Sequence, residues 1–551
     1  MSHLRPLTRL PTHEITNQPP AFEDIDLWSS DTALREAVAR SGGAWAEDRL
    51  RFFGRKMGSA EVIAWGFEAN RHKPELQTFD RYGQRVDEVR YHPSYHRLME
   101  LAIASGMPSV AWTAERGGHV VHAAYEFLQA QAEGGVCCPL SMTYAVVPAL
   151  RHQPELADAL LPKLLATEYE GRCIPMRDKP GITMGMAMTE KQGGSDVRAN
   201  STRAFPIAGS QDEFELVGHK WFCSAPMSDA FLTLAQAPGG LTCFFVPRWL
   251  DDGSRNPFYI QRLKDKLGDH ANASSEIEYA GTWARRVGEE GRGVRTIIEM
   301  VHHTRLDCIV APAAMMRQAV AAASWHTQHR AAFGKRLVEQ PLMRQVLGDL
   351  ILESEAATAL AMRIARSFDE SDADPGARAF SRLATPIAKF WLNKRLPELV
   401  YEAMECHGGA GYIEENVLAR VYRAAPLNSI WEGSGNVICL DVLRAMAREP
   451  ESLAALIAEL SAAKGGDANY DRFLATLLDE FAPGRVTEAG ARRLCERLGV
   501  ALQASVLLRE APSFVAEAFC ASRLADEGRC YGSLPVGVEV GALIERARPQ
   551  V

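Results

Sequence analysis

The chain lacks the patterns that mark several common classes of protein. Its 11 cysteines are scattered, with no C-x-x-C pair and no group of Cys and His at metal-ligand spacing. A dense disulfide framework and a Cys/His metal site are therefore excluded, and no metal is expected. No G-x-G-x-x-G follows a predicted strand, and no Walker A lysine is present, which excludes Rossmann and P-loop nucleotide sites.

Long apolar runs and a secretory leader are also missing. No stretch approaches the ~20 apolar residues that span a bilayer. Residues 1–22 are polar and rich in proline, without the apolar core of a signal peptide. We expect a cytoplasmic protein that is not associated with a membrane.

Positive charge is not in excess. The chain has 61 Lys and Arg against 69 Asp and Glu, a net charge of −8, so binding to a polyanion would need a local patch. With 551 residues and 47% apolar content, a prior of ~150 residues per domain predicts three or four domains around a large core.

Hydrophobic periodicity divides the chain into parts of different secondary structure. The prolines near the start indicate an extended arm, a three- to four-residue apolar period indicates helices, and short alternating runs between turn-rich pieces indicate strands. The predicted fold is mainly α with a central β domain. Its parts are an arm (1–30), an N-terminal helical domain (31–180), a β domain (181–290), a helical bundle (291–448) and a C-terminal helical domain (449–551).

One stretch carries most of the chemical information, Asn428-Ser429-Ile430-Trp431-Glu432-Gly433-Ser434-Gly435-Asn436. It places one carboxylate, Glu432, between a large aromatic residue and a run of small ones. A carboxylate in such a poorly solvated place has a raised pKa and becomes a usable base near neutral pH. The alternative interpretation is a helix N-terminus capped by Ser434 or Asn436.

The stretch resembles the Tyr/Trp-Glu-Gly-Thr/Ser motif of the acyl-CoA dehydrogenase family. Further similar stretches follow the family's order: Met188-Thr189-Glu190 with Gly194-Ser195-Asp196, Gly218 to Ser224, Arg330-Ala331-Ala332-Phe333-Gly334, and Glu405 to Tyr412. Thr12-His13, Asn17-Gln18-Pro19-Pro20 and the long C-terminal extension resemble the AidB branch, named for the adaptive response to alkylation. The resemblance implies a helical domain, a small β-barrel and a four-helix-bundle domain, followed by a C-terminal helical extension.

The resemblance also implies an FAD site assembled from two subunits of a homotetramer. The residues matched to family positions for the cofactor are Met188, Thr189, Ser195, Phe222, Ser224, Arg330, Phe333, Gln340, Glu405, Gly408, Gly409, Ser434 and Asn436. Two of them depart from the family, because Phe222 stands at a tryptophan position and Glu405 replaces a glutamine. Without the resemblance, the same stretches are ordinary turns, a strand, a helix end and a surface arginine.

By the same resemblance, Glu432 takes the α-proton of an acyl-CoA thioester while the β-hydride passes to the flavin. Ser195, Arg305 and Trp431 are the expected substrate contacts. Some relatives carry the base just before a helix arginine, but that position is Thr304 here, which cannot serve. A short or branched substrate such as isovaleryl-CoA is expected, and the activity is expected to be weak.

The alternative function is an AidB-type flavoprotein of the alkylation response that binds double-stranded DNA and has little dehydrogenase turnover. The resemblance places the DNA contacts in the C-terminal region. Residues 441–551 contain 13 Lys and Arg against 16 Asp and Glu, so this region is not basic overall. Arg485, Arg492, Arg493 and Arg497 could still form a basic helix face, or simply a solvated one.

Overall fold

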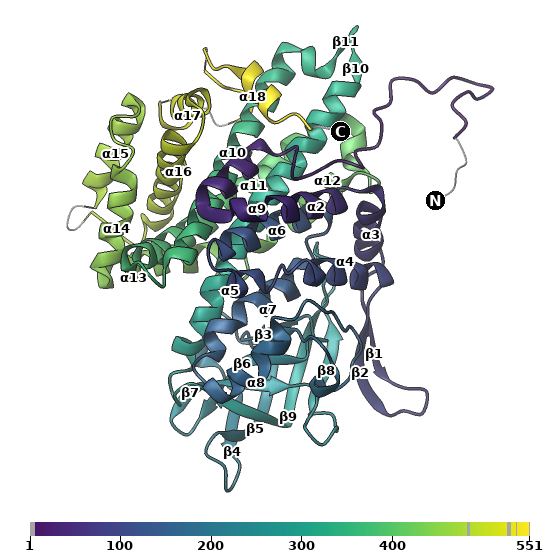
Figure 1. Cartoon of the computed structure of the whole chain (residues 1–551), viewed down its shortest axis with the longest axis vertical. Helices are drawn as coiled ribbons and strands as arrows, with labels where there is room; N and C mark the ends of the chain where they lie inside the picture. Colours follow the sequence, from purple (N-terminus) through teal and green to yellow (C-terminus); the bar gives the residue numbers. More distant parts are fainter. Residues whose placement is uncertain (1–5, 482–484, 526–529, 536, 550–551) are drawn as a thin grey trace.

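The computed structural model describes residues 6–481, 485–525, 530–535 and 537–549, and it is mainly helical with one β domain. Figure 1 shows the β domain at one end of the long axis and the long helices above it, with the C-terminal helices along one side. The chain therefore has the predicted fold class, a central β domain between helical parts with a C-terminal helical extension.

The elements have the following bounds. The helices are α1 (Thr32–Val38), α2 (Glu47–Met57), α3 (Ala60–Arg71), α4 (Pro93–Ala104), α5 (Val110–Thr113), α6 (Gly118–Ala132), α7 (Cys137–Leu150), α8 (Pro154–Leu164), α9 (Gly293–His329), α10 (Pro341–Glu370), α11 (Pro375–Cys406), α12 (Val417–Ala424), α13 (Gly435–Arg448), α14 (Pro450–Ser461), α15 (Ala468–Glu480), α16 (Ala491–Glu510), α17 (Ser513–Cys520) and α18 (Val540–Arg546). The strands are β1 (Glu75–Phe79), β2 (Arg85–Arg90), β3 (Met184–Ala187), β4 (Arg203–Pro206), β5 (Glu213–Ser224), β6 (Ala230–Ala237), β7 (Gly240–Pro247), β8 (Phe258–Leu263), β9 (Ser274–Val287), β10 (Ala331–Ala332) and β11 (Lys335–Arg336).

The β domain closes into a small barrel. Strand β6 pairs with β7 on one side and with β3 and β4 on the other, and β4 continues the ring through β5 and β9 back to β7. Strand β8 joins the outside through β9. Successive side chains of a strand point to opposite faces, and residues such as Phe231, Phe244 and Ile277 form a buried core of the barrel.

The helical core is built on three long helices. Helices α9, α10 and α11 pack against one another, and α6 and α7 of the N-terminal domain pack against α9. Helix α9 is long and apolar enough to cross a membrane by length and composition alone, but 94% of its most apolar window is buried. Its apolar character therefore reflects a central place in the core.

The C-terminal helices dock on the same bundle. Helix α16 packs against α10, α11 and α13, and α18 packs against α10. Buried ion pairs reinforce this contact, with Arg523 3.2 Å from Glu353 and Arg546 2.9 Å from Glu355. The extension is thus continuous with the bundle that carries the Glu432 stretch.

Candidate functional site

Glu432 lies in a tight turn that leads into α13, and its backbone conformation is strained. Its φ is +55°, a value that non-glycine residues rarely adopt, and Gly433 follows at +102°. Side chains from two long helices hold the turn. Arg305 of α9 donates from Nε to the Glu432 carbonyl at 3.0 Å. Lys389 of α11 donates to the carbonyls of Asn428 and Gly433, both at 2.9 Å.

The Glu432 carboxyl lies in a poorly solvated place. Its Oε2 atom is buried and has no hydrogen-bond partner among the described residues. Burial raises the pKa of this carboxyl, and the positive charges of Arg305 and Lys389 offset part of the increase. A carboxylate with a raised pKa and a free oxygen can accept a proton from a bound molecule.

A charge pair beside the turn limits the influence of Arg305. Its Nη1 lies 3.0 Å from Asp441 Oδ2, and Arg382 lies 3.0 Å from the other oxygen of the same carboxylate. Asp441 therefore neutralises part of the positive charge behind Glu432. Neither Lys389 nor Asp441 was predicted from the sequence, since nothing in their local sequence points to the turn at Glu432.

The residues around Glu432 form a half-buried wall. Trp431 donates from its ring nitrogen to Asn428 Oδ1 at 2.5 Å, and Lys394 donates to Ser429 Oγ at 2.7 Å. Ile430 is 63% exposed. Ser434 is the N-cap residue of α13, as the alternative interpretation predicts. Its side chain makes no capping hydrogen bond.

Met188 and Thr189 directly follow β3, which packs against α7. Met188 packs against a cluster that includes Met300 and Val301 of α9, one helical turn before Arg305. Thr189 is half-buried, and its carbonyl accepts a hydrogen bond from the Trp221 amide at 2.7 Å. Ser195 lies in an exposed turn beyond them. Met188 and Thr189 thus lie on the side of the barrel that meets the bundle.

A buried ion pair fixes the segment after β3 to β5. Glu190 and Lys220 are fully buried, with Lys220 Nζ 2.8 Å from Glu190 Oε1. Burial opposes the ionisation of Glu190, but Lys220 and hydrogen bonds from Ser201 and Thr202 hold the pKa of its carboxyl below the usual range. Nothing in the local sequence around Glu190 or Lys220 predicts this pair. It keeps Met188 and Thr189 in place beside Trp221.

The end of β5 carries an exposed aromatic side chain. Phe222 is 49% exposed, and the neighbouring Trp221 ring has the Lys264 ammonium 3.1 Å from its centroid. Ser224 Oγ lies 3.3 Å from Ser274 Oγ of β9. Phe222 and Ser224 therefore occupy one strand end and leave an aromatic face and a hydroxyl to interact with another molecule.

The remaining predicted cofactor residues lie elsewhere in the chain. Arg330, Phe333 and Gln340 surround the β10–β11 hairpin, which Figure 1 shows far from α13. Phe333 is 99% exposed. Glu405, Gly408 and Gly409 are exposed at the end of α11, and Glu405 accepts a hydrogen bond from Tyr401 at 3.4 Å. The predicted cofactor residues thus lie in separate groups: one at the ends of barrel strands and one at the hairpin and the end of α11, both apart from the turn that carries Ser434 and Asn436.

These two groups fit FAD if the cofactor lies between two copies of the chain. A flat dinucleotide needs an aromatic or apolar surface, short hydrogen-bonding side chains and a cation for its phosphates. The first group offers Phe222, Thr189 and Ser224, and the second offers Phe333 and Arg330. Both aromatic rings are exposed in the single chain, as expected for surfaces that a ligand or a second copy covers.

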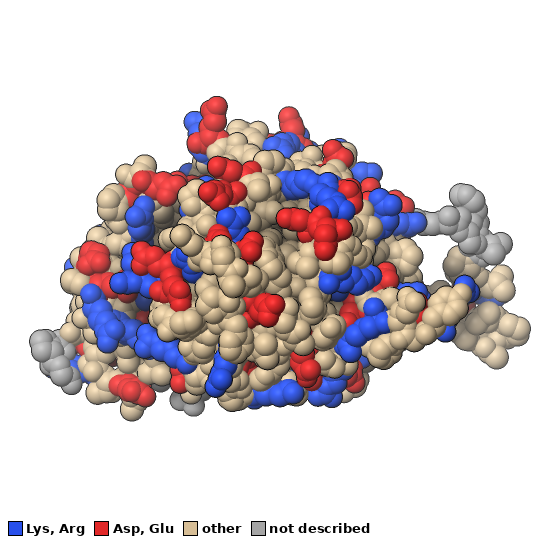
Figure 2. All heavy atoms as spheres, turned by 90° about the horizontal axis from the view of Figure 1, so that it is seen from below, with Lys and Arg blue, Asp and Glu red and all other residues tan. Residues whose placement is uncertain are grey.

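The arginines predicted to contact DNA are largely engaged within the chain. Arg485 pairs with Asp479, and Arg497 contacts Glu480 at 3.3 Å and Thr476 at 2.8 Å. Arg492 donates to Asn436 Oδ1 at 2.9 Å, so it contacts the first turn of α13. Among the described residues, Arg493 makes no ion pair or hydrogen bond. Figure 2 shows acidic side chains interspersed with the basic ones over one face of the molecule.

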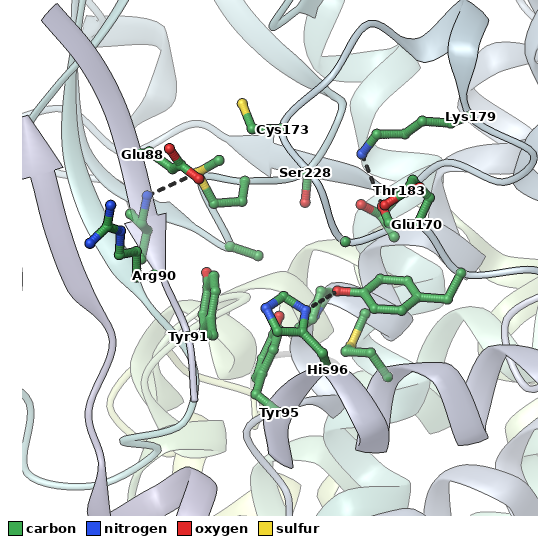
Figure 3. A pocket seen from close by; sticks show the side chains of 17 residues that line it. Glu88, Arg90, Tyr91, Tyr95, His96, Glu170, Cys173, Lys179, Thr183 and Ser228 are labelled. Atoms are coloured by element: carbon green, nitrogen blue, oxygen red, sulfur yellow. Dashed lines mark hydrogen bonds between the residues drawn. The ribbon is translucent and has the colours of Figure 1, made fainter. Parts of the chain in front are cut away.

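A cavity of about 270 Å³ lies between the N-terminal domain and the barrel, and none of the predicted site residues lines it. Figure 3 shows Tyr91, Tyr95 and His96 on one side and Ser228 on the other. Ser228 Oγ is buried without a partner among the described residues, and burial lowers the pKa of His96. The cavity is therefore polar and separate from the Glu432 turn.

Comparison with protein families gives three consecutive matches. Residues 17–171 match the model of the adaptive response protein AidB N-terminal domain. Residues 185–282 match the acyl-CoA dehydrogenase middle domain, and residues 291–447 match the acyl-CoA dehydrogenase C-terminal domain. The turn at Glu432 lies inside the last match.

Individual relatives cover most of the chain. AidB of Escherichia coli (strain K12) is 42% identical over 520 residues, which are 94% of this chain and 95% of that protein. Acyl-CoA dehydrogenase family member 11 of Caenorhabditis elegans is 31% identical over 441 residues, 77% of this chain and 70% of that protein. The crystal structure of Caenorhabditis elegans ACDH-11 in complex with C11-CoA has a TM-score of 0.84 at 26% identity, covering 95% of this chain and 96% of that one.

Proposed function

This chain belongs to the acyl-CoA dehydrogenase family, in its AidB branch, and we propose that it oxidises an acyl-CoA thioester with Glu432 as the base. The observation that carries the proposal is the buried, unpartnered Oε2 of Glu432 in a braced turn. A strained backbone that two buried cations hold in place is typical of a site that serves function rather than folding.

The cofactor of the family is FAD, which accepts a hydride when it is bound. In this chain Met188, Thr189, Phe222 and Ser224 would hold the flavin of the same subunit. Arg330 and Phe333 would hold part of the dinucleotide bound to a neighbouring subunit. Glu405, Gly408 and Gly409 would contact the same dinucleotide, the one bound to the neighbouring subunit.

Glu432 would remove the α-proton through its free Oε2 atom. Its raised pKa makes the carboxylate a stronger base than an exposed glutamate, while the positive charges of Arg305 and Lys389 offset part of the increase. Arg305 and Lys389 donate hydrogen bonds to the backbone carbonyls of Glu432 and Gly433, and these bonds fix the direction of the Glu432 carboxyl. Trp431 and Ile430 would line the path of the acyl group.

Acyl-CoA is the substrate class of the family, and the Caenorhabditis elegans structure was determined with C11-CoA. Within that class we propose a short or branched acyl group such as isovaleryl, with weak turnover. The partly exposed wall at Ile430 and Trp431 supports a shallow site of this kind.

A homotetramer is part of the proposal because the flavin contacts lie in two separate places on each chain. Large apolar side chains are exposed around the second group, including Phe333 (99%), Leu342 (82%) and Tyr412 (86%). Such a concentration of exposed apolar groups supports an interface between copies.

The proposal is tested by anaerobic titration of the FAD-loaded protein with butyryl-, isovaleryl- and C11-CoA, following the visible band of oxidised flavin. We expect bleaching by at least one thioester, with isovaleryl-CoA requiring the lowest concentration. An unchanged flavin with all three, in a protein that dithionite still reduces, would contradict the dehydrogenase assignment.

The DNA-binding alternative has weaker support. Its one favourable observation is Arg493, which is exposed and has no ion pair or hydrogen bond among the described residues. If that helix face binds phosphates, Arg493→Ala should weaken binding to a short duplex at low salt and reduce its salt dependence. Filter binding at two salt concentrations would measure both.

A further inference from the structure

The β10–β11 hairpin is too small to be stable alone. Each strand has two residues, paired Ala331 with Arg336 and Ala332 with Lys335. Its two-residue turn places Phe333 at a φ of +52° and Gly334 at +77°. An isolated two-stranded hairpin is at best marginal in water, and a positive φ at phenylalanine adds strain. Contacts from outside the hairpin must therefore hold it.

The N-terminal arm supplies such contacts through Asn17. The side-chain Nδ2 donates to the Ala331 carbonyl at 2.9 Å, and Oδ1 accepts from the Ala331 amide at 2.8 Å. One side-chain amide thus bonds both backbone groups of a single residue, as the next strand of a sheet would. Asn17 itself has a φ of +58°, which asparagine tolerates better than most residues.

The same arm residue engages the arginine at the base of the hairpin. Arg330 donates from Nη1 to the Asn17 carbonyl at 2.6 Å. Among the described residues, its side chain makes no other hydrogen bond or ion pair. The remaining N–H groups of the guanidinium are left for an anion, and its orientation is set by the arm.

The arm is itself anchored to the core. Trp325 of α9 donates to the Pro20 carbonyl at 2.9 Å, and the Phe22 ring lies 5.5 Å from the Trp325 ring. On the inner side of the hairpin, Gln340 donates to the Ala332 carbonyl at 3.1 Å. The hairpin is therefore clamped between Asn17 and Gln340.

We propose that Asn17 is a positioning residue for cofactor binding between subunits. It holds the hairpin so that Arg330 and Phe333 reach the FAD of a neighbouring copy of the chain. This inference rests on the proposed function. It assigns the N-terminal arm a role in the affinity for a dinucleotide, although the hydrogen bonds of Asn17 among the described residues are to the Ala331 backbone and to Arg330.

The test compares Asn17→Gly with a matched control in the same arm. Glycine keeps the positive φ and removes only the side-chain amide. Asp24 also has a positive φ, +57°, and its Oδ1 accepts from the Ala60 amide at 2.9 Å, away from the hairpin. Asp24→Gly therefore removes an equivalent contact from the same segment without touching the hairpin.

We expect Asn17→Gly to raise the FAD dissociation constant about fivefold, because two exposed hydrogen bonds that hold the hairpin are lost. The tetramer fraction in sedimentation velocity should fall with it. Asp24→Gly should bind FAD as the parent does. Asn17→Asp keeps the acceptor for the Ala331 amide and should therefore bind FAD more tightly than Asn17→Gly does. If Asn17→Gly does not fold, Asn17→Asp is the variant whose FAD affinity is compared with the parent.

The outcomes separate this inference from the function on which it rests. Equal FAD affinity in Asn17→Gly and the parent would overturn the role of Asn17 and leave the proposed function intact. An equal loss of FAD affinity in Asp24→Gly would also overturn the role of Asn17, because the arm would then affect FAD binding only through the overall stability of the protein. A parent protein that binds no FAD would instead remove the proposed function.

Discussion

The turn at Glu432 and the turn at Phe333 place a non-glycine residue with positive φ before a glycine with positive φ. The values are +55° and +102° in the first turn and +52° and +77° in the second. The first is braced from within by the buried Lys389 and by Arg305, and its side chain ends in a buried oxygen. The second is braced by the N-terminal arm, and its side chain is 99% exposed.

This difference shows how one strained conformation serves two purposes. At Glu432 the surrounding helices supply burial and charge, which alter the pKa of a carboxyl inside the subunit. At Phe333 the arm supplies only hydrogen bonds, and the aromatic ring is presented outward. The inner turn is therefore expected to control chemistry and stability, and the outer turn to control the affinity for a cofactor shared between copies.

Lys389→Met should give the largest change in stability, because it removes the brace of the inner turn. The carbonyls of Asn428 and Gly433 lose their donor in a buried place, so the free energy of unfolding should fall by about 2–4 kcal/mol. Urea denaturation measures this change. A loss comparable to that of an exposed lysine, below ~0.5 kcal/mol, would show that the brace is unimportant.

The same substitution should shift the pH dependence of flavin reduction by substrate. Burial raises the pKa of Glu432, and Lys389 lowers it. The parent rate should rise with pH as the carboxyl loses its proton, with a midpoint above that of an exposed glutamate. Without Lys389 the midpoint should move to still higher pH. A midpoint that moves down in Lys389→Met would contradict the assigned electrostatics.

Phe333→Asn tests the outer turn with a smaller effect. Asparagine tolerates a positive φ, and the lost ring is exposed in the single chain, so the free energy of unfolding should change by less than about 0.5 kcal/mol. The FAD dissociation constant should rise about fivefold, as for the loss of one aromatic contact. Flavin fluorescence titration would reveal it, and unchanged FAD binding would remove the ring from the cofactor site.

Arg492→Ala should give a small loss of stability and leave FAD binding unchanged, because its contact lies at the edge of the inner turn. It removes one exposed hydrogen bond to Asn436, worth about 0.5–1 kcal/mol of stability. Arg493→Ala on the same helix should change stability by less, because that side chain makes no comparable contact among the described residues. Thermal unfolding of the two variants measures both changes in stability. Equal losses of stability would show that the hydrogen bond to Asn436 does not contribute.

Residue patterns predicted the repetitive parts of this fold well. The first half of the strand within 213–224 alternates, the strand within 230–237 is a continuous buried run, and the long helices carry a sustained apolar period. The β1–β2 hairpin was not predicted, because its strands are charged and half-exposed and show no apolar alternation. Strands β4 and β8 were also missed, because each is short and neither alternates apolar and polar residues over its whole length.

Sequence patterns predicted a site residue only where the residues next to it in the chain also form its surroundings. Glu432 stood out through its neighbours, and its burial followed from them. Lys389 reaches the turn from a helix some 40 residues away in sequence, and Glu190 pairs with Lys220 across two strands. Arg492 was predicted on charge as a DNA contact, while the structure pairs it with Asn436. Such pairings depend on tertiary packing, which spacing along the chain does not encode.

The most direct test of Glu432 as the base is the single-turnover rate of flavin reduction by acyl-CoA in Glu432→Gln. Glu61→Gln, the same change at an exposed residue of α3 outside the site, is the matched control. We predict that Glu432→Gln retains FAD and loses at least 10²- to 10⁴-fold in rate, while Glu61→Gln reduces its flavin at the parent rate. A Glu432→Gln protein that reduces its flavin as fast as the parent would contradict the account.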